Sequence, residues 1–369
     1  MFWWLHYTTA NVENVEDRPL VIWLQGGPGA SSTGFGNFAE LGPLDVNLQV
    51  RNTSWDKYVN VLFVDNPVGT GYSYVDTNDA LTTTNKQIAE DFVEFLKGFY
   101  EALPLFKDVP LYIFSESYGG KMTAEIALVL YQAIQNGQIE SKFKGIGLGD
   151  SWISPIDSVL TWAPYLLTTG VVDKNGYEAI MKVAEKTKES LEAGNFVEAT
   201  ELWGKTERAV DVASYGVDFY NILTKIKGYN NNKIGKSHLH KPNMRDEDYE
   251  ISVLMNGQVK EALNIDRQWG ENTNVFKYLT EDFMKPVTDI VEKLLNTTDI
   301  KWVDNLHWSG KEEWISIKQE AFAVDNYNEG YVKKVGNLAM YSINRSGHMV
   351  PSDNPAAMNY ILKDVTNYV

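Results

Sequence analysis

The stretch YIFSESYGGKM, residues 112–122, decides the fold of this chain. Its first half is apolar and β-prone and its second half begins a helical pattern, which predicts a strand that turns at once into a helix. Hydrolases place a nucleophilic serine at such a turn, usually within G-x-S-x-G. Here Ser115 stands where the first glycine belongs, and Ser117 stands where the nucleophile belongs. Ser117 is therefore a candidate nucleophile, and a buried serine in an ordinary turn is the alternative interpretation.

Four short apolar runs, bounded by Gly, Pro or Asn, are typical of strands buried on both faces of a parallel sheet. A helical pattern with apolar residues on one face fills 82–104 and is ended by Pro104, and a second one follows Ser117. Strand, helix and strand in this order predict an α/β sheet with parallel crossovers. The four runs are 19–25, 60–66, 110–117 and 145–152.

The strand signal stops after residue 154, and two amphipathic helical patterns follow at 174–194 and 195–214. They predict an inserted helical cap. The polar, Asn-rich stretch 225–248 predicts a mobile surface loop. Helical patterns at 250–265 and 281–296 and a late strand at 337–344 follow. We expect a hydrolase core in 1–154 and 249–369, and the cap with its loop in 155–248.

Composition excludes several classes of function. The net charge of −16 makes nucleic acid an unfavourable partner, because phosphates would be repelled. The chain has no cysteine, which excludes disulfides, thiolate metal sites and cysteine catalysis. No apolar run approaches the ~20 residues of a membrane helix. Neither G-x-G-x-x-G nor a Walker A lysine occurs, which argues against nucleotide binding. We expect no cofactor and no metal.

The first residues, MFWWLHYTT, have neither the basic segment nor the cleavage site of a signal peptide. They are typical of a strand, which suggests that Met1 is an internal methionine of a longer parent. N-x-S/T sequons lie at Asn52, Asn296 and Asn344, and glycosylation there would require a secretory route.

Two further stretches carry chemistry. WLQGGPGASS, residues 23–32, forms a Gly-rich loop after a strand, which in α/β-hydrolases supplies an oxyanion donor and otherwise is a simple turn. SINRSGHMVPSDNP, residues 342–355, places His348 in a loop after the last strand signal, where a hydrolase has its base. Hydrogen-bonded structure is the commoner role for a lone loop histidine. The other four histidines are less suitably placed: His6, His238, His240 and His307.

Taken together, these stretches resemble the serine carboxypeptidase family along the whole chain, because NVLFVDNPVGTGYSY and GLGDSWISP also occur in family order. FSESYGGKM and GDSWISPIDSVL are most similar to the retinoid-inducible branch, which also has Ser for Gly before the nucleophile. The resemblance implies an α/β-hydrolase fold with a helical insertion. It also implies release of carboxy-terminal residues from peptides, favoured at acid pH, in secreted or lysosomal enzymes.

The resemblance assigns roles residue by residue. Ser117 matches the nucleophile, His348 its base, and the backbone N–H groups of Gly27 and Tyr118 the oxyanion hole. Three residues match those with which the family binds the substrate's terminal carboxylate: Gln25, Glu40 and Glu116. Two glutamates would repel that carboxylate unless they share a proton, which burial and like charge favour. Peptides with a free carboxy terminus are therefore the expected substrates, bound better at acid pH.

The acid that should orient the histidine has no counterpart. Family members carry a strand and then an Asp where Ile300 here runs directly into Lys301. Asp299 and Asp304 flank this point, but the family alignment does not match either to the triad acid. Loss of an orienting Asp costs roughly 10⁴ in rate. A catalytically impaired paralogue that binds peptides or a protein partner is therefore an alternative, as is an esterase or acyltransferase on the same fold.

Overall fold

The computed structural model describes residues 1–225, 246–270, 273–297 and 307–368. The chain forms two compact units. The first unit comprises Met1–Ile153, Glu247–Lys277 and Val287–Val369, and the second comprises Ser154–Asp246 and Tyr278–Pro286. Every described residue of the predicted site belongs to the first unit.

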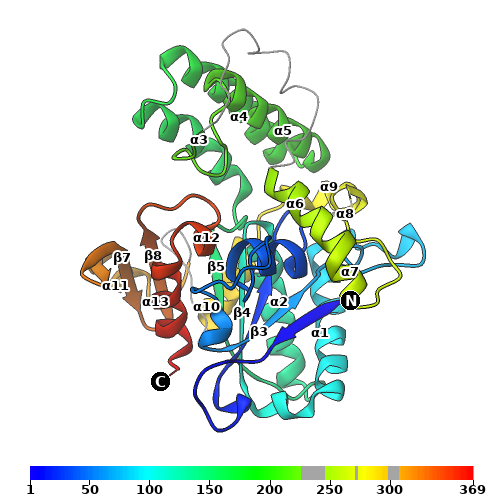
Figure 1. The fold of residues 1–369 in the computed structure, drawn as a ribbon. Helices are drawn as coiled ribbons and strands as arrows, with labels where there is room; N and C mark the ends of the chain where they lie inside the picture. The colour runs from blue at the N-terminus through cyan, green and yellow to red at the C-terminus, as the bar shows by residue number, and fades with distance from the viewer. Residues whose placement is uncertain (226–245, 271–272, 298–306, 369) are drawn as a thin grey trace. The chain divides into compact units, whose positions relative to one another are not determined.

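The first unit is built on a five-stranded sheet in the order β1-β3-β2-β4-β5 (Figure 1). β2 runs parallel to β3 and β4, and β4 runs parallel to β5, while β1 is antiparallel to β3. Every residue of β2 and β3 is buried, as their unbroken apolar runs predicted. The strands are β1 (Trp3–His6), β2 (Leu20–Leu24), β3 (Asn60–Val64), β4 (Pro110–Glu116) and β5 (Lys142–Gly149).

The two predicted helices beside the sheet are confirmed. α1 (Asn85–Ala102) begins at Thr84, whose side chain accepts from the Gln87 N–H in a capping box, and it ends two residues before Pro104. α2 (Tyr118–Gln135) starts directly after β4 and packs against α1 and β5. This strand-to-helix connection places residue 117 at the carboxyl edge of the sheet.

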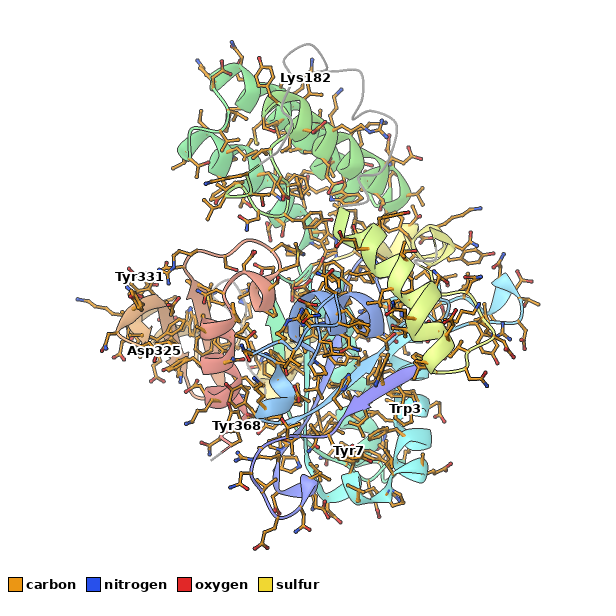
Figure 2. The ribbon with its side chains drawn as sticks, in the orientation of Figure 1. Trp3, Tyr7, Lys182, Asp325, Tyr331 and Tyr368 are labelled. Atoms are coloured by element: carbon orange, nitrogen blue, oxygen red, sulfur yellow. The ribbon has the colours of Figure 1, made fainter. Side chains whose placement is uncertain are left out.

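β5 forms one edge of the central sheet among the described residues, and its side chains are half-buried or exposed. The next strands along the chain, β6 (Glu320–Val324), β7 (Tyr327–Val335) and β8 (Leu338–Ile343), form a separate antiparallel sheet. Sequence reasoning predicted only β8. The missed signal was the Asp325–Asn326 turn, where both residues have positive φ and join β6 to β7 (Asp325 is labelled in Figure 2).

The second unit is helical. α4 (Lys174–Glu192) packs against α5 (Phe196–Ala213) and α3 (Pro155–Thr168), around Ile180 and Val210. α9 (Thr280–Phe283) packs on α5, so residues 278–286 join this unit. The loop predicted at 225–248, with His238 and His240, lies outside the described residues except at its ends.

The helix predicted at 281–296 is broken. α9 ends at Phe283 and α10 (Thr288–Thr297) begins after Pro286, because proline cannot donate within a helix. No helix in the described ranges is long and apolar enough to cross a membrane. The remaining helices are η1 (Val15–Asp17), η2 (Ser32–Leu41), η3 (Trp55–Lys57), η4 (Asn78–Ala80), η5 (Pro104–Asp108), α6 (Asp246–Leu254), η6 (Met255–Val259), α7 (Lys260–Ala262), α8 (Thr273–Tyr278), α11 (Lys311–Ser316), α12 (Val350–Asp353) and α13 (Pro355–Thr366).

Candidate active site

Ser117 occupies a strained turn between β4 and α2, with φ 59° and ψ −131°. This conformation is rare for a residue with a side chain and persists only where the surroundings enforce it. The Ser117 N–H donates to the Gly149 carbonyl at 3.0 Å, and its carbonyl accepts from the Trp152 N–H at 2.9 Å. The end of β5 therefore holds the turn, and the Ser117 side chain stays partly exposed at the edge of the sheet.

Close packing explains the glycines around this turn. A Cβ on Gly26 would lie 2.6 Å from the Ser117 Cβ, and one on Gly119 would lie 2.6 Å from the Leu24 carbonyl oxygen. Neither contact is sterically possible, so the Gly-rich loop approaches the Ser117 turn, and the start of α2 approaches the end of β2, as only glycine allows. Ser115 is 2% exposed on β4, so a small hydroxyl side chain fits where the usual motif has glycine.

A buried carboxyl, missed in the sequence, fixes the Gly-rich loop. Asp65 follows β3 and accepts hydrogen bonds from the Ser31 hydroxyl at 2.6 Å and from the Thr33 N–H and hydroxyl at 3.0 and 2.8 Å. The Tyr72 N–H is a fourth donor at 3.0 Å. Burial raises the pKa of Asp65, and these hydrogen bonds lower it. Gly27 lies in this loop with φ +104°, a conformation that favours glycine.

Gln25, Glu40 and Glu116 form one buried cluster, although they come from the end of β2, from η2 and from β4. The Gln25 side-chain amide nitrogen donates to Glu40 at 2.9 Å and to Glu116 at 2.5 Å. Burial raises the pKa of Glu116 well above its usual value, and the negative charge of Glu40 raises it further. A hydrogen bond between the two carboxyls acts in the same direction. Such a pair holds a proton at a pH where isolated glutamates are ionised.

Asp150 is a further carboxyl at this edge that the sequence did not reveal. It directly follows Gly149, which pairs with Glu116 across β4 and β5, and its φ is +41°. The surrounding protein atoms, together with the charge of Asp353, raise the pKa of Asp150 to about 7. Part of the Asp150 side chain is nevertheless exposed to water. Asp150 in turn raises the pKa of Glu116. The sequence signal that could have identified Asp150 is its position directly after the strand that neighbours the nucleophile-bearing strand.

His348 lies between β8 and α12 and is half-buried. The N–H of the preceding Gly347 donates to the Asp353 carboxylate at 2.7 Å, which ties the loop to α12. α12 packs against η2, and the Met349 side chain packs against a hydrophobic cluster that includes Phe35 and Phe38 of η2. The His348 loop therefore packs against the helix that carries Glu40.

Four acid and base candidates remain, two histidines and two aspartates. His6 is a half-buried strand residue whose ring contacts Asn37, and desolvation of the imidazole lowers its pKa. His307 is exposed. Asp299 and Asp304, on either side of the expected acid, lie outside the described residues. No group of three His, Asp or Glu side chains that could hold a metal ion occurs within the described ranges.

Comparison with known proteins agrees with this architecture. The serine carboxypeptidase family profile matches residues 1–368. The retinoid-inducible serine carboxypeptidase of Mus musculus is 43% identical over 399 residues, covering 99% of this chain and 88% of its own length. The one from Homo sapiens is 44% identical, covering 96% and 85%. The crystal structure of Kex1(delta)p, a prohormone-processing carboxypeptidase from Saccharomyces cerevisiae, shares the fold with a TM-score of 0.81 at 23% identity, covering 99% and 86%.

The chain therefore belongs to the serine carboxypeptidase family and has the α/β-hydrolase fold. It is a serine-type carboxypeptidase, a hydrolase, and among the relatives compared it is similar to the retinoid-inducible enzymes. The alignment with the mouse enzyme is longer than the 369 residues of this chain, so that relative carries internal residues with no counterpart here.

Proposed function

From this family membership, we propose that the chain cleaves carboxy-terminal residues from peptides with Ser117 as nucleophile and His348 as general base. The Ser117 hydroxyl attacks the last peptide carbonyl while His348 takes its proton. The backbone N–H groups of Gly27 and Tyr118 stabilise the oxyanion. The imidazolium then gives the proton to the leaving amine, and water hydrolyses the acyl-enzyme by the reverse sequence. The strained turn at Ser117, crowded by Gly26, supports this assignment.

We propose that Gln25, Glu40 and Glu116 bind the terminal carboxylate of the substrate. The observation that carries the proposal is the buried Gln25 amide nitrogen, which bonds both glutamates at 2.9 and 2.5 Å. With one proton between them, the two carboxyls can donate to an incoming carboxylate instead of repelling it. This cluster favours peptide acids over neutral esters, so it favours a carboxypeptidase over an esterase or acyltransferase.

The same cluster predicts the direction in which substrate binding changes with pH. Glu116 has a raised pKa because it is buried beside Glu40 and Asp150, so the pair retains its proton at acid pH. As the pH rises, the proton is lost and a second negative charge appears in the binding site. Substrate binding should therefore weaken with rising pH, giving an acid optimum.

We further propose a secreted or lysosomal location, by family resemblance. Of the three sequons, Asn52 is exposed and lies in a loop before η3. The Asn296 side chain donates to the Glu292 and His307 carbonyls and accepts from the Ser309 N–H. Expression through a secretory pathway, followed by mass spectrometry of the glycopeptides, tests the location, and modification at Asn52 is expected. We also keep the division into a core, 1–154 and 249–369, and a helical cap, 155–248, as a proposal.

The function is tested with an N-blocked dipeptide and the amide of the same dipeptide at pH ~5. We expect hydrolysis of the free acid only, since the amide lacks the carboxylate that Gln25 and its partners bind. Ser117→Ala should lower kcat by roughly 10⁶, the cost of losing a serine nucleophile, and should abolish labelling by a fluorophosphonate. Equal rates on acid and amide would refute the carboxylate site, and labelling of Ser117→Ala would refute the nucleophile.

A further inference from the structure

His348 is carried by the smaller sheet, not by the central sheet that carries Ser117. β8 pairs only with β7 among the described strands, and the loop 344–354 leaves β8 and enters α13. A loop of this kind needs fixed ends if a side chain near its middle is to keep one position.

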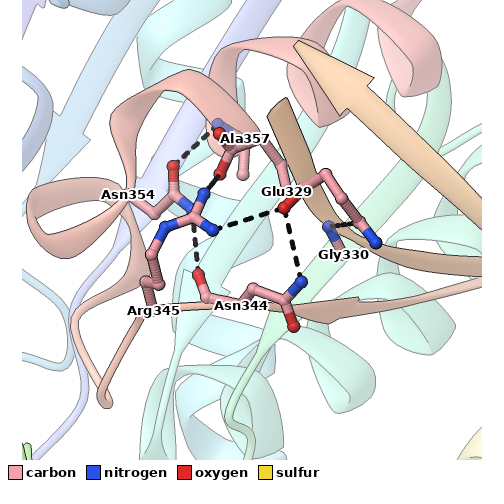
Figure 3. Close-up of polar contacts among 7 residues, drawn as sticks. Glu329, Gly330, Asn344, Arg345, Asn354 and Ala357 are labelled. Atoms are coloured by element: carbon pink, nitrogen blue, oxygen red, sulfur yellow. Dashed lines mark hydrogen bonds and ion pairs between the residues drawn. The ribbon is translucent and has the colours of Figure 1, made fainter. Parts of the chain in front are cut away.

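Both ends of the loop are tied to one buried side chain, that of Glu329 on β7, which is 6% exposed (Figure 3). At the first end, the Arg345 guanidinium forms an ion pair with the Glu329 carboxylate, and beside it the Asn344 N–H donates to the backbone carbonyl of Glu329 at 2.8 Å. At the far end, the Asn354 side-chain amide donates to the same carboxylate oxygen at 2.7 Å.

Asn354 closes the loop in two further ways. Its amide also donates to the Asn344 carbonyl at 2.9 Å, which joins the first and last residues of the loop directly. Its side-chain oxygen accepts from the Ala357 N–H and so caps α13. Arg345 has φ +55°, an unfavourable value for a residue with a side chain, which the ion pair helps to maintain. Together, Glu329, Asn344, Arg345 and Asn354 form what we call the Glu329 clasp.

We propose that Glu329 is a positioning residue for the reaction, because its clasp fixes the loop that presents His348 to Ser117. This inference rests on the proposed role of His348 as general base. In this proposal Glu329 acts through the loop and not on the substrate. A buried carboxylate suits this task, since one side chain accepts from donors at both ends of the loop and its charge shortens those bonds.

The clasp predicts a defect in turnover and not in substrate binding. Gln25, Glu40 and Glu116, which we propose to bind the carboxylate, lie at the end of β2, in η2 and in β4, and none of them bonds to a residue of the clasp. Loosening the loop displaces the base, and a displacement of about 1 Å at a reacting group can lower the rate about 100-fold.

The test compares Glu329→Gln with Asp364→Asn in the full chain. Asp364 pairs with Lys334 of β7 at 2.6 Å and accepts from the Tyr341 hydroxyl of β8, so the control removes contacts between the same small sheet and α13 but none to residues 344–354. We expect Glu329→Gln to lower kcat between about 10- and 100-fold with KM within about 2-fold, and the control to change neither. Equal kcat in the two variants, or a rise in KM with unchanged kcat, would overturn the proposal.

A second variant and a second measurement serve in case Glu329→Gln does not fold. Arg345→Gln removes only the exposed partner of the clasp, and we expect a smaller loss of kcat, about 2- to 10-fold, again with KM retained. The imidazole resonances of the five histidines, with His348 assigned by a His348→Gln variant, report the loop without requiring turnover. His348 should shift and titrate differently in Arg345→Gln but not in Asp364→Asn; an unshifted resonance in Arg345→Gln would overturn the proposal.

The test is separable from that of the proposed function. If His348→Gln and Ser117→Ala both abolish activity while Glu329→Gln and Arg345→Gln match the control, the clasp is refuted and the catalytic assignment stands. If His348→Gln retains full activity, the assignment of the base is refuted whatever the clasp variants do.

Discussion

The two halves of the site are held by different kinds of structure. Ser117 stands on a buried parallel strand whose neighbours on both sides are fixed, and backbone contacts leave no room for a side chain at Gly26. His348 stands in a loop after a small antiparallel sheet, and polar side chains hold that loop at its ends. The first half is positioned by close packing and the second by hydrogen bonds.

This difference affects how each half should respond to change. Packed backbone is intolerant of added volume but insensitive to pH, whereas clasps and carboxyl clusters respond to charge. The pH dependence of the enzyme should therefore come from carboxyls around the serine, and its tolerance to substitution should be greater around the histidine.

The largest effect should follow from adding one methyl group to the Ser117 half. Gly26→Ala would place a Cβ 2.6 Å from the Ser117 Cβ, so either the loop or the turn must move. We expect kcat to fall about 100-fold or more, with loss of about 1–3 kcal/mol of stability. Kinetics and denaturant unfolding measure both quantities.

The control for this comparison is Gly98→Ala on α1, where an added Cβ meets nothing within 4 Å. It should leave kcat unchanged and stabilise the helix by up to about 1 kcal/mol. A Gly26→Ala enzyme with normal kcat would show that the Ser117 turn is not set by packing.

A smaller effect is expected from the charge beside the glutamate pair. Asp150 raises the pKa of Glu116, so Asp150→Asn should let the pair lose its proton at lower pH. The alkaline limb of the kcat/KM profile should therefore move to lower pH. Asp353→Asn is the matched control, because Asp353 raises the pKa of Asp150 but is not among the causes that act on Glu116.

The outcomes for Asp150 are distinct. An upward shift of the limb in Asp150→Asn would mean that the Asp150 charge acts chiefly by repelling the substrate. An unchanged limb in both variants would remove Asp150 from the site. An equal downward shift in both would assign the effect to the His348 loop, which Asp353 contacts through Gly347.

The smallest predicted effect is the change of thermal stability with pH. The pKa values of Asp150 and Glu207 are each raised to about 7 by burial, from ordinary values of 3.8 and 4.5. Both groups bind protons more tightly when folded, so their contribution is lost as the pH rises from about 4 to 7 and is level above 7. The Asp150 side chain is exposed, so solvent screens its contribution and Glu207 should carry most of the effect. We expect a lower Tm at pH 8 than at pH 5.

Calorimetry of Asp150→Asn and Glu207→Gln checks this expectation, because each substitution should reduce the difference between the two pH values. Glu207 lies on α5 of the helical unit and Asp150 at the end of β5, so the two variants separate the units. A Tm that rises between pH 5 and pH 8 would contradict the assigned shifts.

The sequence by itself determined the parallel strands, the helices beside them and the turn at Ser117. These follow from local signals: apolar runs, helical periodicity, and glycines at positions that no other residue tolerates. It also indicated the family and, through it, the residues that we propose for the site. The helix predicted over 281–296 was wrong, because Pro286 interrupts it. β6 and β7 were missed because the alternation of polar and apolar residues in them is weak.

Only the tertiary structure decided how distant residues act together. Gln25, Glu40 and Glu116 come from three elements, and the raised pKa of Glu116 depends on burial that no local pattern records. The same holds for Asp65, which fixes the Gly-rich loop, and for Glu329, whose partners lie 15 to 25 residues away. A local pattern specifies the conformation of a segment, whereas a carboxyl's pKa and partners depend on what the fold places around it.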